Sequence, residues 1–263
     1  MAHSSLIKKL EGKVAIVTGG ASGIGEATAC LFAQHGARAI VIADIQDAKG
    51  QQVAESIGSG QCSYIHCDVT EEAQVQAMVD WTVRSYGQLD IMFSNAGILF
   101  GDPDQVILDL DLSKADRLFS TNVRGMAACV KHAARAMVEG HVRGSIVCTT
   151  SIAATKGYMK WTDYIMSKHA ILGLVRAACQ QLGGYGIRVN CVSPSLVATP
   201  LVLNAENKDA GEIEKESEAL APLKGIVLRT KHVADAVLFL ACDESAYVSG
   251  HNLVVDGGND TNL

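Results

Sequence analysis

A short apolar strand that runs directly into a glycine-rich turn is the feature that most constrains the fold of this chain. Val14–Thr18 is apolar and β-branched, as in a buried strand, and Gly19–Gly25 follows with four glycines. A helical pattern then runs from Ile24 to His35 and stops at Gly36. Glycines let such a turn adopt positive φ and approach a ligand closely, while the start of the helix attracts a pyrophosphate. The order of strand, glycine turn and helix predicts a dinucleotide-binding unit.

An acidic residue at the end of the second predicted strand supports this interpretation. Residues 38–43 form that strand pattern, and Asp44 ends it nineteen residues after Gly25, which is the spacing expected of a dinucleotide site. The carboxylate of Asp44 can accept hydrogen bonds from the adenosine ribose hydroxyls and would repel a 2′-phosphate. Ile45 and Gln46 offer no arginine to neutralise such a phosphate, so NAD is favoured over NADP. The alternative is that Asp44 only caps a helix beginning near Asp47.

Strands and helices alternate along the rest of the chain. Further strand patterns lie at residues 63–67, 91–94, 145–149, 187–192 and 252–255, and helical patterns at 71–86, 114–138, 162–182 and 230–242. We therefore predict an α/β single-domain Rossmann fold, a doubly wound sheet of seven mostly parallel strands covered on both faces. A polar N-terminal arm, residues 1–12, precedes the catalytic domain at 13–263. Ser113 and Asp116 match a capping box that would open the long helix.

Polar residues and glycines follow several predicted strands. Asp68-Val69 follows the third strand and Asn95-Ala96-Gly97 the fourth, while Ser151 comes just after the fifth. Ligands of open parallel sheets bind at the carboxyl ends of the strands, where these residues would meet. Asp68 is placed to meet the amino group of an adenine.

Tyr164 and Lys168 lie four residues apart in a predicted helix, so that both side chains share one face. A tyrosine titrates near pH ~10, and acting as a base near neutrality requires a pKa about three units lower. A neighbouring ammonium and a bound cationic cofactor could supply that change. The alternative is an aromatic ring packed beside a lysine stem, without chemistry. Asn122, inside the preceding helix, would ordinarily be a solvated or back-bonded side chain.

Residues 196–225 form the part of the chain that differs most in composition. From Thr199 to Gly225 the sequence is charged and helical, with few large apolar residues. Two interpretations stay open, a flap that covers the site and a plain solvated helix.

The composition of the chain limits the classes of partner, the location and the kinds of site that we expect. The net charge of −6 and the absence of a lysine or arginine cluster argue against nucleic acid and acidic membranes. No apolar run is long enough to cross a bilayer, and residues 1–11 lack the apolar core of a signal peptide, so a cytosolic location is predicted. Eight cysteines without a Cys-x-x-Cys pair, and scattered histidines, predict neither disulfides nor a metal site.

Several motifs together resemble the short-chain dehydrogenase/reductase family. They are Thr18-Gly-x-x-x-Gly-x-Gly25, Asn95-Ala-Gly97, Ser151 and Tyr164-x-x-x-Lys168, and the resemblance covers essentially the whole chain. Three further runs look like its plant branch, which contains secoisolariciresinol dehydrogenase and the monoterpenol dehydrogenases acting on borneol: His132-Ala-Ala-Arg, Tyr185-Gly-Ile-Arg-Val-Asn-Cys-Val-Ser-Pro194 and Asp243-Glu-Ser-Ala-Tyr-Val-Ser-Gly250. Two positions depart from the family pattern, Ser94 in place of an asparagine and Ser195 in place of a glycine.

The resemblance implies a catalytic set of Asn122, Ser151, Tyr164 and Lys168. Tyr164 would be the general base, Lys168 would bind the nicotinamide ribose and lower the pKa of the tyrosine, and Ser151 would hydrogen-bond the substrate oxygen. Asn122 would hold the water of a proton relay, and Thr199 would contact the nicotinamide amide. The family usually forms homotetramers through its long helices, here residues 114–138 and 162–182.

The predicted ligand contacts fall into two groups. Those for the cofactor, NAD, are Gly19, Ser22, Gly23, Ile24, Gly25, Asp44, Asp68, Val69, Asn95, Ala96, Gly97, Tyr164, Lys168, Pro194, Val197 and Thr199. Those for the substrate are Leu99, Ser151, Ala153, Tyr158, Trp161, Tyr164 and Leu201, within an apolar wall that also includes Ile98, Phe100, Ile152, Ala154, Leu196 and Leu203.

The preference for NAD suggests oxidation of a secondary alcohol to a ketone as the working direction. The apolar wall suits a hydrophobic substrate, a terpenoid alcohol such as borneol. Two alternatives are kept. One is the oxidation of a lignan diol or a steroid-like alcohol on the same scaffold, and the other is a dinucleotide-binding scaffold without a redox step.

Overall fold

The computed structural model describes residues 8–101 and 105–260. Its centre is one sheet of seven strands in the order β3-β2-β1-β4-β5-β6-β7. The strands are β1 (Val14–Thr18), β2 (Ala39–Asp44), β3 (Cys62–His66), β4 (Ile91–Ser94), β5 (Ser145–Thr149), β6 (Arg188–Pro194) and β7 (Asn252–Val255). Every pair of neighbours is parallel. The doubly wound α/β fold predicted from the sequence is confirmed, and its sheet is wholly rather than mostly parallel.

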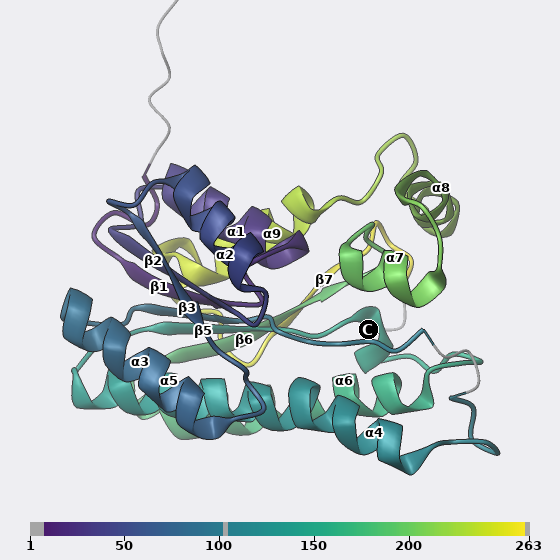
Figure 1. Cartoon of the computed structure of the whole chain (residues 1–263), viewed down its shortest axis with the longest axis horizontal. Coiled ribbons are helices and arrows are strands. Elements are labelled where there is room, and N and C mark those ends of the chain that lie inside the picture. The colour runs from purple at the N-terminus through teal and green to yellow at the C-terminus, as the bar shows by residue number, and fades with distance from the viewer. Residues whose placement is uncertain (1–7, 102–104, 261–263) are drawn as a thin grey trace, which may run out of the picture.

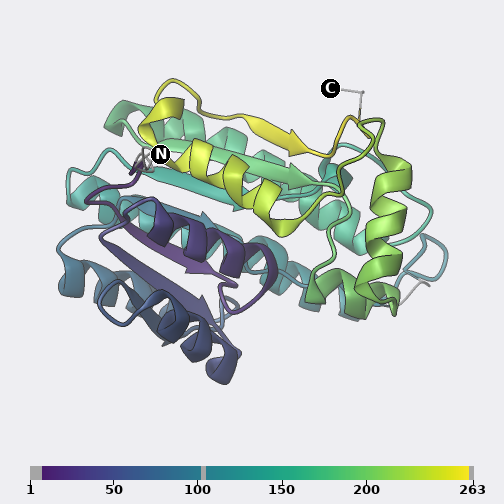
Figure 2. The same ribbon diagram turned by 90° about the horizontal axis from the view of Figure 1, so that it is seen from above.

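Helices cover both faces of the sheet (Figures 1 and 2). One layer contains α1 (Gly23–Gln34), α2 (Asp47–Ile57) and α9 (Thr230–Ala241), and the other contains α3 (Glu72–Tyr86), α5 (Met126–Glu139) and α6 (Thr162–Leu182). Alternate residues of each strand point to opposite layers. Ile16 therefore packs toward α3 and α5, whereas Ala15 and Val17 pack toward α1 and α9. Both faces of the sheet are thus buried.

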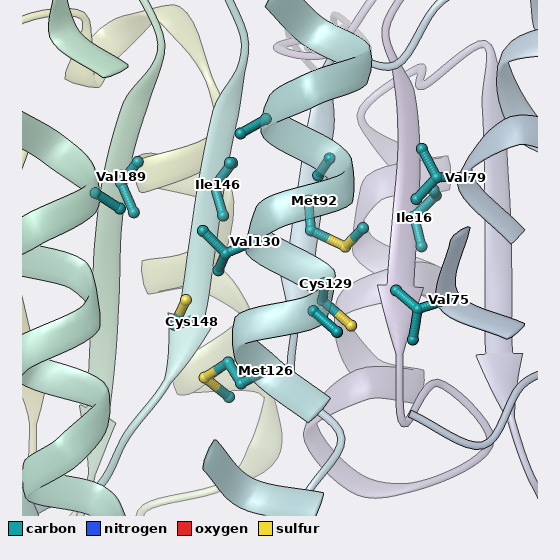
Figure 3. Packing of buried hydrophobic residues seen from close by; sticks show 14 of the residues in the cluster. Ile16, Val75, Val79, Met92, Met126, Cys129, Val130, Ile146, Cys148 and Val189 are labelled. Carbon is teal, nitrogen blue, oxygen red and sulfur yellow. The ribbon is translucent and has the colours of Figure 1, made fainter. Parts of the chain in front are cut away.

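Figure 3 shows the core on the side of α3 and α5. Ile16, Met92, Ile146 and Val189 come from four different strands, and all are 0% exposed. Val130 of α5 lies over them and is also buried. This continuous apolar layer fixes the relative positions of the strands and therefore of the loops at their carboxyl ends.

The predicted helix at residues 114–138 is wrong in two respects. It begins as α4 (Leu112–Phe119), passes through a π-helical segment, η1 (Ser120–Gly125), and continues as α5. The cap is Asp111, whose carboxylate accepts hydrogen bonds from the backbone N–H groups of Ser113 at 2.9 Å and Lys114 at 3.1 Å. Ser113 is therefore already inside the helix, and the predicted Ser113–Asp116 capping box is not the start.

The segment after β6 forms two helices, α7 (Pro200–Glu206) and α8 (Ala210–Leu220). A capping box of Asp209 and Glu212 begins α8. In Figure 2 the strands point toward the end of the molecule at which these helices lie. The charged segment is therefore at the carboxyl edge of the sheet, where the site was predicted.

Two further features concern the ends of the chain and its helices. The described part of the N-terminal arm packs on the domain, since Leu10 is fully buried and its N–H donates to the carbonyl of His35 at 3.0 Å. Among residues 8–101 and 105–260, no helix combines the length and apolarity needed to cross a membrane.

Candidate active site

A cavity of about 370 Å³ opens at the carboxyl ends of the central strands. Most of the predicted site residues line it: Gly19, Ser22, Gly23, Ile24, Asp44, Asp68, Val69, Asn95, Ala96, Gly97, Ser151, Tyr164, Lys168, Pro194, Val197, Thr199 and Leu201. Asn122, Gly25, Leu99, Ala153, Tyr158 and Trp161 are not among its lining residues. The structure thus brings the predicted cofactor set together, but not the outer substrate wall.

The glycine turn needs its glycines for two different reasons. Gly19 and Gly23 have φ angles of +64° and +59°, a region that other residues rarely adopt. A Cβ on Gly25 would collide with the carbonyl oxygen of Gly19. Gly25 therefore closes the turn on itself rather than facing the ligand, which explains why it does not line the cavity.

Asn95 holds this turn against the neighbouring strands. Its side-chain amide donates to the carbonyls of Thr18 at 3.1 Å and Gly19 at 3.3 Å, and its oxygen accepts from the hydroxyl of Thr149 at 3.0 Å. One side chain thereby connects the ends of β1, β4 and β5. We infer a structural task for Asn95 that the sequence pattern alone did not reveal.

The start of α1 fits a pyrophosphate. The first N–H groups of any α-helix lack partners within the helix. Ser22 stands at the N-cap but makes no capping hydrogen bond, so its hydroxyl does not satisfy them. Ser22, Gly23 and Ile24 all line the cavity. These donors and the helix dipole suit a negatively charged group between the two halves of a dinucleotide.

Asp44 lies at the end of β2 beside the glycine turn, lines the cavity and is 7% exposed. Its carboxylate accepts hydrogen bonds from the backbone N–H of Ala21 and of Gln46, both at 3.0 Å. The N-cap of α2 is Gln46, and it has no side-chain cap. Asp44 therefore ties the glycine turn to the end of β2 rather than capping α2, while its edge faces the space predicted for the ribose.

Tyr164 and Lys168 lie side by side on α6, and both reach the cavity. The ammonium of Lys168 is 5.3 Å from the centre of the Tyr164 ring and donates to the carbonyl of Thr149 at 3.1 Å. Burial lowers the pKa of Lys168 to about 8. Burial also raises the pKa of Tyr164 to about 12, although a hydrogen bond with Ser151 acts in the lowering direction.

The direction for Tyr164 is opposite to the lowered pKa that the sequence predicted. Desolvation of the phenolate is the largest effect, and the hydrogen bond with Ser151 does not outweigh it in the protein alone. A base at this position therefore depends on further positive charge, which a nicotinamide ring would bring when bound.

Asn122 is fully buried in η1 and does not behave as a solvated helix residue. Its side-chain amide donates to the carbonyl of Ile98 at 2.9 Å, and its oxygen accepts from the N–H of Ile98 at 2.8 Å. A second donor contact reaches the hydroxyl of Ser167 at 3.3 Å. The π-helical turn thus fastens the loop after β4 to α6, at the side of Tyr164.

Some cavity residues were missed by the sequence interpretation, including Thr121, Thr149, Thr150 and Val202. Thr149 was the easiest of these to predict, because it ends a predicted strand beside Ser151. The position of Thr121 depends on the π-helical turn, which no pattern in the sequence predicted. Among the described residues, no group of three or more histidine, cysteine, aspartate or glutamate side chains could hold a metal ion.

Comparisons with known proteins agree with the geometry. A family model described as enoyl-(acyl carrier protein) reductase matches residues 19–260. The chain is 56% identical to a (-)-isopiperitenol/(-)-carveol dehydrogenase, mitochondrial, of Mentha piperita over 96% of this chain and 95% of that protein. It is 55% identical to a (+)-cis,trans-nepetalactol synthase of Nepeta racemosa over 95% of this chain and 94% of the relative.

A solved structure gives the same picture. The short-chain type dehydrogenase/reductase from Mycobacterium marinum superimposes with a TM-score of 0.87 at 33% identity, covering 97% of this chain and 98% of that one. The fold, the glycine turn and the Ser151, Tyr164 and Lys168 cluster are thus accompanied by similarity along almost the whole chain. The protein belongs to the short-chain dehydrogenase/reductase family.

Proposed function

We propose that the protein oxidises a hydrophobic secondary alcohol to a ketone with NAD, and that the substrate is a cyclic terpenoid alcohol such as borneol. The observation that carries this proposal is the convergence of Ser151, Tyr164 and Lys168 on one cavity that Asp44 also lines. A proton acceptor and a dinucleotide cradle thus share one cleft.

The proposed roles follow from position and charge. Tyr164, as the phenolate, takes the hydroxyl proton of the alcohol, and Ser151 donates a hydrogen bond to the same oxygen. Lys168 holds its positive charge beside the Tyr164 ring and offsets the charge of the phenolate. When bound, the nicotinamide would accept the hydride from the carbinol carbon of the alcohol. Asn122 positions the loop after β4 next to this group and is proposed to hold a water of the proton relay.

The cofactor proposal rests on the glycine turn and on the end of β2 beside it. Ser22, Gly23 and Ile24 would bind the pyrophosphate, and Asp44 would accept the ribose hydroxyls. Neither Ile45 nor Gln46 brings a positive charge that could accommodate a 2′-phosphate. We therefore propose NAD rather than NADP. Asp68, Val69, Pro194, Val197 and Thr199 would complete the contacts.

The substrate proposal draws on the relatives and on the apolar outer loops. One of the relatives is named as a dehydrogenase of isopiperitenol and carveol. Leu99, Ala153, Tyr158, Trp161 and Leu201 remain our prediction for the substrate contacts. Tyr158 is close enough to Tyr164 to affect its pKa, although it does not line the cavity.

A lignan diol or a steroid-like alcohol is the alternative within redox chemistry. A non-redox step is a second candidate, and one observation favours it. Relatives that are 53 to 55% identical to this chain are named nepetalactol synthases rather than dehydrogenases. A scaffold of this kind would bind the dinucleotide without consuming it.

A panel of alcohols tests the substrate class. The purified protein is mixed with NAD and, in turn, with borneol, another cyclic monoterpenol, a lignan diol and a steroid alcohol, while NADH absorbance is followed. We expect the fastest turnover with the monoterpenols. Fastest turnover with the lignan or steroid alcohol would replace the terpenoid proposal, and NAD binding without NADH formation on any alcohol would favour the non-redox candidate.

Assembly and location complete the proposal. We propose a homotetramer built through α4, α5 and α6, which light scattering would test by giving four times the mass of the 27.7 kDa chain. The predicted cytosolic location stays a prediction, and the name of the Mentha piperita relative places that protein in mitochondria.

A further inference from the structure

The short helix α7 has little of its own to hold it in place. Of its seven residues, only Ala205 is buried. Helices of this length are unstable by themselves in water, so contacts with other segments must fix the position of α7. Its first turn matters for the site, because Pro200, Leu201 and Val202 line the cavity.

The first contact that fixes α7 is with the loop after β4. A Cβ on Gly101 would lie 2.9 Å from the carbonyl oxygen of Ala205 and 3.2 Å from its Cα. The two backbones therefore touch with no side chain between them. This contact fixes the distance of α7 from the loop after β4, but a contact at a single point does not fix the direction of the helix.

The second contact is an ion pair between α7 and the loop that precedes α6. The ammonium of Lys160 lies 3.0 Å and 3.1 Å from the two carboxylate oxygens of Glu206, the last residue of α7. The side chain of Glu206 is 13% exposed and that of Lys160 is 40% exposed. Lys160 belongs to the loop after β5, so the pair joins two segments that leave different strands. Partial burial makes such a pair stronger than one on the open surface.

Lys160 also contacts the residue that begins the catalytic helix. Its ammonium lies 4.0 Å from the centre of the Trp161 ring, which is a cation–π geometry. Trp161 has φ 63° and ψ 46°, a left-handed conformation that is unfavourable for a bulky residue and persists only where its surroundings enforce it. α6 starts directly after Trp161, and Tyr164 lies in its first turn. One lysine thus touches both α7 and the start of the helix that carries Tyr164.

A second lysine near Glu206, Lys208, belongs to the short segment between α7 and α8. Lys208 lies 3.6 Å from Glu206, but its closer partner is Glu216 at 2.6 Å. Lys208 therefore connects α7 with α8, whereas Lys160 connects α7 with the loop before α6.

We propose that Lys160 and Glu206 are positioning residues, which hold α7 over the substrate end of the cleft and thereby determine the affinity for the alcohol. This inference rests on the proposed function, because it assigns the outer part of the same site. Neither residue touches the reacting atoms. Both act through α7 and Trp161, the walls between which an apolar substrate would lie.

Steady-state kinetics of four variants test this assignment. Glu206→Gln and Lys160→Met each remove the pair, Lys160→Arg keeps the charge, and Lys231→Met removes a lysine that pairs within one helix with Asp235 at 2.7 Å. We expect Glu206→Gln and Lys160→Met to raise the KM for the alcohol about 5-fold, with kcat within about twofold of wild type. Lys160→Arg and Lys231→Met should resemble wild type. The double variant should be no worse than either single variant, because both remove one interaction.

A fluorescence measurement tests the same contact without turnover. The chain has two tryptophans, Trp81 and Trp161, so a Trp81→Phe background leaves Trp161 as the reporter. In that background we expect Glu206→Gln to increase quenching of Trp161 by acrylamide, because Glu206 no longer holds the Lys160 ammonium over the Trp161 ring. An unchanged alcohol KM, additive effects in the double variant, or unchanged quenching would overturn the proposal. If wild type oxidises no alcohol, the proposed function fails, and quenching alone decides the role of the ion pair.

Discussion

Two titratable groups at the site, the buried Lys168 and the partly buried Tyr164, show what single residues contribute here. Burial keeps the pKa of Lys168 low, at about 8, and the pKa of Tyr164 high, at about 12. Both shifts disfavour the charged forms on which the proposed chemistry depends. Of these two groups, only Lys168 lowers the stability of the folded protein without cofactor near neutral pH, because Tyr164 is uncharged there in both the folded and the unfolded state. A positively charged ring beside Tyr164 would favour its phenolate.

The titration of Lys168 predicts a pH-dependent stability. Its pKa is about 8 in the folded chain against 10.5 for an unburied lysine, so the unfolded state binds more protons between these values. The free energy of unfolding of wild type should therefore rise with pH relative to Lys168→Met, by about 2 kcal/mol from about pH 7 to about pH 9.5. Urea unfolding of both proteins without cofactor measures this difference. Parallel pH profiles would show that the ammonium of Lys168 is not penalised by burial.

Asp44 predicts the choice of cofactor. Asp44→Asn keeps the shape of the side chain but removes the charge that would repel a 2′-phosphate. The ratio of kcat/KM for NAD to that for NADP should fall about 10-fold or more. Asp47→Asn is the matched control, because Asp47 begins α2 but does not line the cavity. An unchanged ratio in Asp44→Asn, or an equal change in the control, would contradict the role given to Asp44.

Among the elements, the segment from α4 to α5 differs most from its predicted form. The apolar stripe of residues 114–138 indicated a single helix. The π-helical segment is only six residues long, which is too short to disturb such a stripe. The turn nevertheless decides where Asn122 points, and its amide bonds both backbone groups of Ile98. A sequence pattern can place a residue on an element, but it cannot show a local change of helix type.

The start of α4 gives a direct test of this element. Asp111 accepts two backbone N–H groups, whereas Ser113 contributes its own N–H as a donor. Asp111→Ala should lower the free energy of unfolding by about 1 kcal/mol, and Ser113→Ala should change it by no more than a few tenths. Urea denaturation of the two variants measures both values. A larger loss in Ser113→Ala would restore the capping box that the sequence suggested.

For the whole molecule, alternation of strands and helices was sufficient to predict the architecture. The β-branched runs placed β1, β4, β5 and β7 at their observed bounds, because a buried parallel strand is apolar on both faces. The strand-end rule then brought Asp44, Asn95 and Ser151 to one edge. Contacts between distant loops were not predictable in this way. The ion pair of Lys160 with Glu206 joins a loop to α7, and the approach of these two segments depends on the assembled sheet.

Transfer of deuterium from substrate to cofactor tests the central claim most directly. The protein is incubated with NAD and with the best alcohol of the panel, deuterated at its carbinol carbon, and the NADH formed is examined by mass spectrometry. We predict one deuterium in the NADH for each ketone produced, and a rate at least about 100-fold lower in Tyr164→Phe. A product that forms without deuterium in the cofactor, or an undiminished rate in Tyr164→Phe, would contradict the proposed redox chemistry at this site.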